Sequence, residues 1–113
     1  MHEAIFSDKG FADGLSTIHL AKALIDEGFH PMTMYFPLVV HGAMLVEPTE
    51  TESKAALDQF ILAMRSIAER AKAGDQSLKA SPIHAPRRRL DETLAARKPV
   101  LVYRDPEPAQ AAE

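Results

Sequence analysis

Residues 49–74 read TETESKAALDQFILAMRSIAERAKAG, and this stretch decides the fold class. Its apolar side chains recur at helical spacing over about four turns and are Leu57, Phe60, Ile61, Met64, Ile67, Ala68 and Ala71. Gly74 ends the pattern, and Thr49 with Glu52 predicts a capping box at its start, where the helix dipole also favours Glu50. The stretch therefore predicts a long amphipathic helix that covers a core.

The residues before this helix predict short strands around a first helix. Residues 2–6 are a mostly apolar run that ends in a turn-rich cluster, which is typical of a strand. Ser16 is a good N-cap, and apolar residues recur at helical spacing from there until Gly28. Residues 34–40 and 43–46 are strand-like, but a proline inside the first run indicates an edge or broken strand.

The residues after the long helix predict a less regular region. A linker leads through residues 85–86 to a short helical stretch at residues 90–96 and an extended segment at residues 99–103. The composition of residues 105–113, with two prolines and several alanines, predicts a disordered tail. We therefore expect one domain, residues 1–104, followed by this tail.

The order of these elements predicts an α+β fold: a two-layer sandwich in which a small, mostly antiparallel sheet carries helices on one face. The other face would be open. Phe36, Leu38, Val39 and Met44 look too apolar for solvent, so we expect them on that open face. Another domain or a second copy of the chain would then cover them.

Composition excludes several classes of protein. The 113 residues are 46% hydrophobic and 26% charged, which is typical of a globular domain. A net charge of −3 gives no footprint for nucleic acid or an anionic membrane, and the absence of cysteine excludes disulfides and thiolate metal sites. No apolar run has the length of a transmembrane helix and the first residues do not form a signal peptide, so we expect a cytoplasmic protein.

Few residues carry recognisable chemistry by themselves. The five histidines lack the spacing of metal ligands, so no metal is expected, but His30 lies between a helix stop and Pro31, where a loop can present it. Glu47 stands at a strand end and is not explained by helix capping. Residues 87–89 are three arginines that fit either a phosphate contact or, more simply, a salt-bridged surface beside Asp91. These residues alone do not indicate a complete enzyme.

Two longer motifs carry a resemblance to a known family. Residues 28–37 read GFHPMTMYFP and residues 47–54 read EPTETESK, and shorter matches continue to residues 99–101. With them the chain resembles the C-terminal region of the glycine cleavage system P-protein, in particular the second subunit of the two-subunit bacterial form. The chain departs from the family pattern at Met32, where a second proline is usual, and at Arg87, where valine is usual.

The resemblance implies part of glycine dehydrogenase (decarboxylating). That enzyme decarboxylates glycine with pyridoxal phosphate and transfers the aminomethyl group to the lipoyl arm of the H-protein. The implied fold is the small C-terminal domain of an aspartate-aminotransferase-type enzyme, which meets a large domain and subunit 1. It also implies an active-site wall formed by His30, Thr33 and Glu47, with Arg89 as an anion or salt-bridge contact.

The family binds the cofactor through a lysine in a His-Lys-Thr context on the large domain. No lysine of this chain follows a histidine or precedes a threonine. The lysines are Lys9, Lys22, Lys54, Lys72, Lys79 and Lys98. We therefore expect this chain alone to be inactive and to bind no pyridoxal phosphate. Two alternatives remain open: a stand-alone, non-catalytic interaction or dimerisation module derived from the domain, and, more distantly, the small domain of another pyridoxal phosphate enzyme.

Overall fold

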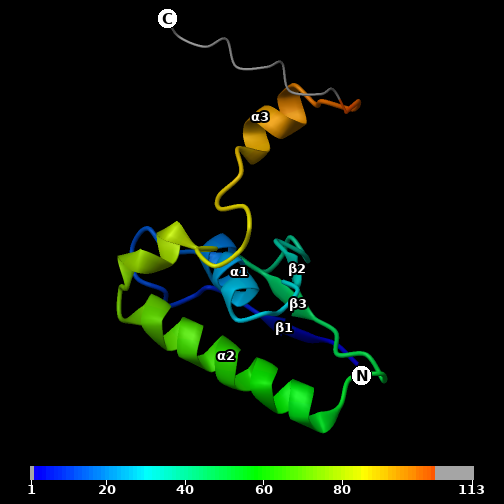
Figure 1. Cartoon of the computed structure of the whole chain (residues 1–113). Coiled ribbons are helices and arrows are strands. Elements are labelled where there is room, and N and C mark those ends of the chain that lie inside the picture. The colour runs from blue at the N-terminus through cyan, green and yellow to red at the C-terminus, as the bar shows by residue number, and fades with distance from the viewer. Residues whose placement is uncertain (1, 104–113) are drawn as a thin grey trace, which may run out of the picture.

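The computed structural model describes residues 2–103 and contains a small sheet, two long helices and a projecting C-terminal segment (Figure 1). In chain order the elements are β1 (Ala4–Phe6), α1 (Thr17–Asp26), β2 (Thr33–Met34), β3 (Met44–Val46), α2 (Lys54–Lys72), the 3-10 helix η1 (Gln76–Ala80) and α3 (Glu92–Arg97). The predicted α+β class is confirmed. The predicted disordered tail, residues 105–113, lies outside the described residues.

The sheet has three antiparallel strands in the order β1-β3-β2. Leu45 in the central strand lies opposite Ile5 of β1 and opposite Thr33 of β2. The predicted strand at residues 43–46 is therefore confirmed as β3. Of the run at residues 34–40, only the start pairs with β3, because the chain then turns through Pro37, which has no backbone N–H for a ladder.

Helix α1 begins and ends where local chemistry predicts. Ser16 is its N-cap, and the backbone N–H of Ser16 donates to Nδ1 of His19 over 3.1 Å, which completes a capping box. Gly28 follows the last turn with φ +84°, a left-handed conformation that glycine adopts without the cost of a Cβ. The predicted first helix is confirmed.

The core lies between the two long helices and the central strand. Its most buried large side chains are Leu20, Leu24, Met44, Ile67 and Leu78. The expectation that Met44 lies on an open apolar face is wrong, because its side chain is 2% exposed and packs in this core. Phe36, Leu38 and Val39 are exposed as expected, and Val39 reaches 92%, but they lie in the loop between β2 and β3 and not on a face of the sheet.

Helix α2 starts later than the capping-box pattern predicts. Its N-cap is Ser53, whose Oγ accepts the N–H of Ala56 over 3.1 Å, whereas the hydroxyl of Thr49 pairs with that of Thr51. Residues 47–52 carry the chain from the end of β3 to the start of α2 (Figure 1), and the N–H of Glu52 donates to the carbonyl of Thr49 over 3.0 Å, which closes a separate turn before the helix begins. The predicted end at Gly74 is confirmed by its φ of +81°.

The segment after η1 projects away from the rest of the domain (Figure 1). It contains α3, which confirms the predicted short helix but buries no residue, and residues 99–103 form no strand. Two contacts hold its start: Asp26 accepts the backbone N–H groups of Ile83 and His84 over 2.8 Å, and Lys22 Nζ lies 2.7 Å from Glu92 Oε1. Across residues 2–103, no helix combines the length and the apolarity that crossing a bilayer requires.

Candidate functional site

A hollow of about 410 Å³ opens between β3, the loop before β2 and the first turns of α2. We refer to it as the β3–α2 pocket. It is lined by Phe29, His30, Pro31, Met32, Thr33, Leu45, Val46, Glu47, Pro48, Glu52, Ala56, Leu57 and Phe60. The structure therefore brings together His30, Thr33 and Glu47, although whether they form an active-site wall stays a prediction.

The floor of the β3–α2 pocket is apolar. The rings of Phe29 and Phe60 meet edge to face with centroids 5.4 Å apart, a favourable aromatic geometry. Phe29 is directed there by the end of α1, because its N–H donates back to the carbonyl of Leu24 over 2.9 Å after the turn at Gly28. Leu45 from β3 also lines the hollow. Two helices and the central strand thus fix this floor.

The polar groups of the β3–α2 pocket come from loops and strand ends. His30 precedes β2, Glu47 directly follows β3, and Glu52 precedes α2; all three are exposed. Within residues 2–103, no lysine or arginine nitrogen lies within 4 Å of either glutamate. The pocket therefore combines an apolar floor with two carboxylates that have no strongly basic partner.

Glu52 is a site residue that sequence reasoning missed. In the EPTETE run, Thr49 and Glu52 fit the pattern of a capping box, and a helix that began at Thr49 would have placed Glu52 inside its first turn. Because the helix starts at Lys54, Glu52 is free to line the pocket instead. The sequence does contain a signal for the later start, because Ser53 is a second good N-cap four residues after Thr49.

Glu47 also belongs to an exposed polar cluster at the end of β1. Nε2 of His2 lies 3.4 Å from Oε1 of Glu3 and 3.7 Å from Oε1 of Glu47. The antiparallel register, in which Ala4 faces Val46, brings the two glutamates across from one another. The three donor atoms lie within 4.8 Å of each other, a juxtaposition that spacing along the chain does not reveal. All three side chains are exposed, so we assign no metal to them.

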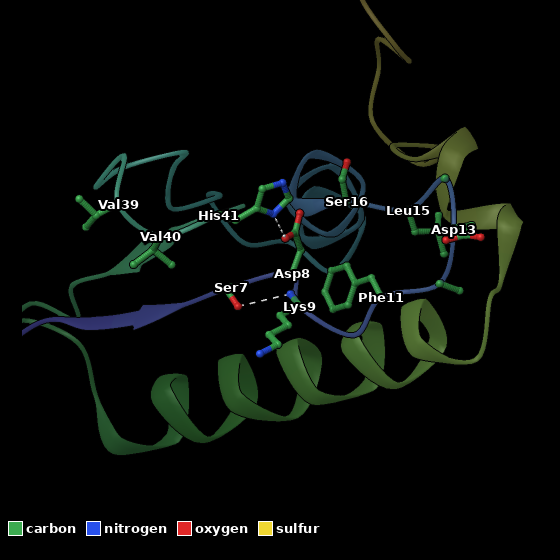
Figure 2. Close-up of a pocket in the computed structure, with 12 residues that line it drawn as sticks. Ser7, Asp8, Lys9, Phe11, Asp13, Leu15, Ser16, Val39, Val40 and His41 are labelled. Carbon is green, nitrogen blue, oxygen red and sulfur yellow. Dashed lines mark hydrogen bonds and ion pairs between the residues drawn. The ribbon is translucent and has the colours of Figure 1, made fainter.

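A second hollow, of about 590 Å³, lies beside the start of α1 and is shown in Figure 2. Asp8 lies at its edge with a side chain only 7% exposed. Its Oδ2 accepts the backbone N–H of Thr17 over 3.2 Å, and its Oδ1 pairs with Nδ1 of His41 over 3.1 Å. The Thr17 hydroxyl donates to the carbonyl of Gly42 over 2.6 Å.

These contacts give Asp8 a structural role. Its carboxylate lies at the N-terminus of α1, where the helix dipole favours negative charge, and it links that helix to the end of β1 and the turn before β3. His41, by contrast, is 94% exposed. We therefore place the candidate functional site at the β3–α2 pocket, where His30, Thr33 and Glu47 lie together.

Arg89 lies elsewhere, on the projecting segment before α3 and outside the β3–α2 pocket. Its positive charge influences two titratable groups. The pKa of His19 is lowered first by burial and then by the charges of Arg89 and Lys79. Arg89 also contributes to the lowered pKa of Glu92. The pKa of Glu92 is lowered mainly by the hydrogen bond from Lys22. An anion contact for Arg89 stays a prediction.

Fold and site together define a small α+β domain whose β3–α2 pocket is open and part apolar. The sequence model of the family described as "Glycine dehydrogenase, C-terminal domain" matches residues 1–86. That match covers more than half of the chain, so the chain belongs to this family. The resemblance found from residues 28–37 and 47–54 is confirmed.

Curated relatives extend the match beyond residue 86. The chain is 65% identical over 106 residues to the probable glycine dehydrogenase (decarboxylating) subunit 2 of Caulobacter vibrioides, covering 92% of this chain and 20% of that protein. The proteins of the same name from Shouchella clausii and Fervidobacterium nodosum are 50% and 45% identical, over 90% and 92% of this chain and 21% and 22% of their own lengths. The chain thus spans about a fifth of the length of these relatives.

Proposed function

We propose that this chain acts as the C-terminal domain of glycine dehydrogenase (decarboxylating) subunit 2 and contributes a wall to that enzyme's active site. The observation that carries the proposal is the 65% identity to the Caulobacter vibrioides relative over 92% of the chain. The β3–α2 pocket supports it, because residues of both resemblance motifs, including His30 and Glu47, line one hollow. The reaction proposed for the whole enzyme is glycine decarboxylation with aminomethyl transfer to the lipoyl H-protein.

The residues present do not fit pyridoxal phosphate, the cofactor that the resemblance implies. No lysine lines the β3–α2 pocket, so no amine there can form the covalent bond to the cofactor. When ionised, Glu47 and Glu52 can accept hydrogen bonds but cannot donate them, and their negative charge would repel a phosphate group. We therefore assign the cofactor and its lysine to the part of the subunit outside this chain, and the task left to this chain is to shape the site.

The acidic pocket suits a decarboxylase in one respect. In many relatives of the aminotransferase fold an arginine clamps the substrate carboxylate, whereas β3 and the residues that follow it, through Pro48, contain no arginine. Holding a carboxylate tightly in the ground state would not lower the barrier to expelling it. Glu47 would disfavour such binding, and Glu47→Gln in the whole enzyme is expected to lower the rate of decarboxylation.

Exposed apolar side chains supply a docking surface for the remainder of the subunit and for subunit 1. They flank the sheet and are Ile5, Phe6, Tyr35, Phe36, Leu38 and Val39. A small domain that leaves such residues in water is typical of one that packs against another domain. The same surface would serve a homodimer if the chain acts as the stand-alone module.

A chimera tests the proposal. The last fifth of the Caulobacter vibrioides subunit would be replaced by this chain, and exchange of labelled carbon dioxide into glycine would be measured with subunit 1 and the H-protein. We expect the chimera to retain most of the parent's exchange rate, and Glu47→Gln to reduce it. A folded, assembled chimera with no exchange would refute the proposal.

The stand-alone module is tested separately in native extract. An antibody against residues 54–72 would detect a band several times larger than 12.4 kDa if the chain belongs to a full-length subunit. A band at 12.4 kDa that runs as one defined oligomer would favour the interaction module instead.

A further inference from the structure

We propose that the β3–α2 pocket binds an alkylammonium group, the side chain of a lysine presented by the part of the subunit outside this chain. This inference rests on the proposed function for its partner, but the binding chemistry belongs to the pocket alone. The hollow, about 410 Å³, falls within the range of roughly 300–1,000 Å³ that small-ligand pockets occupy.

The floor matches an aliphatic stem. Phe29, Leu45, Leu57 and Phe60 line the hollow, and each is only partly buried by the rest of this domain. Lysine buries its methylene chain along such apolar surface while the charged head stays at the wet edge. A polar ligand without a hydrocarbon stem would leave this floor in contact with water.

The rim matches a compact positive charge. Glu47 and Glu52 line the same hollow from the two ends of the β3–α2 connection, one directly after β3 and one shortly before α2. An ammonium is a point charge with three rotatable donors and can contact carboxylates that approach from different directions. A guanidinium pairs best with one carboxylate held flat against its planar fork, and would then leave the other glutamate of the rim without a partner.

The domain's own nearby lysine does not fill the pocket. Lys54 follows Glu52 closely in sequence, but its Nζ pairs with Asp58 one turn along α2. The only base in contact with either glutamate among residues 2–103 is the exposed imidazole of His2, 3.7 Å from Glu47. Negative charge therefore remains at the rim for a cation from elsewhere.

The remainder of the subunit is the source of that cation. The chain spans about a fifth of the length of its curated relatives, so about four fifths of such a subunit lies outside it. The pocket lies beside β3, and the exposed apolar residues Ile5 and Phe6 belong to the neighbouring strand β1. A segment that covers those residues would lie on the strand next to β3, whose Leu45 and Val46 line the pocket.

The first test uses this chain alone and small probes, so its result does not depend on glycine dehydrogenase activity. The chain would be titrated with n-pentylammonium, n-butylguanidinium, 1-pentanol and n-pentanoate, with NMR shifts read at Phe29, Leu45 and Phe60. We expect pentylammonium to bind several-fold more tightly than pentanol, and pentanoate to give no shifts there. Equal binding of the amine and the alcohol, or tighter binding of n-butylguanidinium, would overturn the proposal.

Matched variants locate the charge. Glu47→Gln and Glu52→Gln should each weaken pentylammonium binding about two- to fivefold, the size expected for exposed ion pairs, and should leave pentanol binding unchanged. Glu50→Gln is the control, because Glu50 lies on the same loop but does not line the pocket. Glu47→Asp keeps the charge and should retain binding. An equal effect of Glu50→Gln would refute the assignment.

The second test identifies the occupant in the assembled chimera. A carbodiimide joins a carboxylate directly to an amine that touches it, and mass spectrometry would then locate the new amide bond. We expect Glu47 or Glu52 to be joined to a lysine of the remaining subunit. If the assembled chimera forms such bonds only at other glutamates, the lysine side chain is the wrong occupant.

Discussion

Gly42→Ala is expected to destabilise the domain strongly, because the space for its side chain is already taken. A Cβ at this position would lie 2.0 Å from Oδ1 and 2.1 Å from Cγ of Asp8, far inside contact distance. The carboxylate would have to leave the Thr17 N–H and His41. The φ of +57° at Gly42 adds the strain of a left-handed alanine.

The magnitude follows from these two costs. The left-handed conformation costs roughly 1–2 kcal/mol, and displacing a buried, hydrogen-bonded carboxylate costs about 1–3 kcal/mol, so we expect about 2–5 kcal/mol in the free energy of unfolding. That is a large share of the roughly 5–15 kcal/mol that stabilises a domain. Gly10→Ala is the control, because Gly10 also has positive φ, +93°, but no atom lies within 4 Å of its Cβ position.

Urea unfolding followed by circular dichroism measures both variants. Gly10→Ala should cost only the conformational term of about 1–2 kcal/mol. In an Asp8→Ala background the crowding atoms are gone, and Gly42→Ala should then cost no more than Gly10→Ala does. Additive effects of Asp8→Ala and Gly42→Ala would refute the reasoning, because residues that compete for one space must show coupling.

Three further predictions concern caps and carboxylates. Ser53→Ala should lower the free energy of unfolding by about 0.5–2 kcal/mol, and Thr49→Ala by much less, in the same urea assay, because only Ser53 caps α2; equal losses would return the helix start to Thr49. Hydrogen bonds from a neighbouring serine and an arginine lower the pKa of Asp75 from 3.8 to about 2. Since the folded form has the lower pKa, Asp75 should stabilise the fold above about pH 4 and lose this effect as the pH falls to about 2, so melting temperatures of wild type and Asp75→Asn should converge there. Asp26→Asn should speed amide hydrogen exchange at residues 83–84, whose N–H groups its carboxylate accepts; unchanged protection would show that other contacts hold the projecting segment.

The helices could be predicted from sequence because their signals are local. The apolar period of residues 57–71 and the left-handed glycines at residues 28 and 74 act within a few residues, and the structure follows both. The predicted start of α2 was wrong by one turn, because both Thr49 and Ser53 are good N-cap residues. In the structure a separate turn at residues 49–52 precedes α2, and the capping-box pattern does not distinguish that turn from the first turn of the helix.

Long-range contacts set the limit for the core and the site. Met44 looked like a residue of an open face, but short twisted strands do not fix which side of a sheet meets the helices, and it packs beside Leu24 and Ile67. Asp8 lies in an ordinary turn sequence, and its burial depends on Thr17 and His41, distant in the chain. His30, Thr33 and Glu47 were predicted together only through the family resemblance, since no spacing rule joins them.

The strand order β1-β3-β2 has a consequence for the growing polypeptide. In the part of the chain that the structure describes, β1 pairs only with β3, so the strand at Ala4 has no partner until Val46 has been synthesised. At about 5–20 residues per second, that interval lasts roughly 2–8 seconds on the ribosome. Throughout it, Ile5 and Phe6 form an unpaired apolar strand edge, the kind of segment that chaperones bind and that aggregates when they do not.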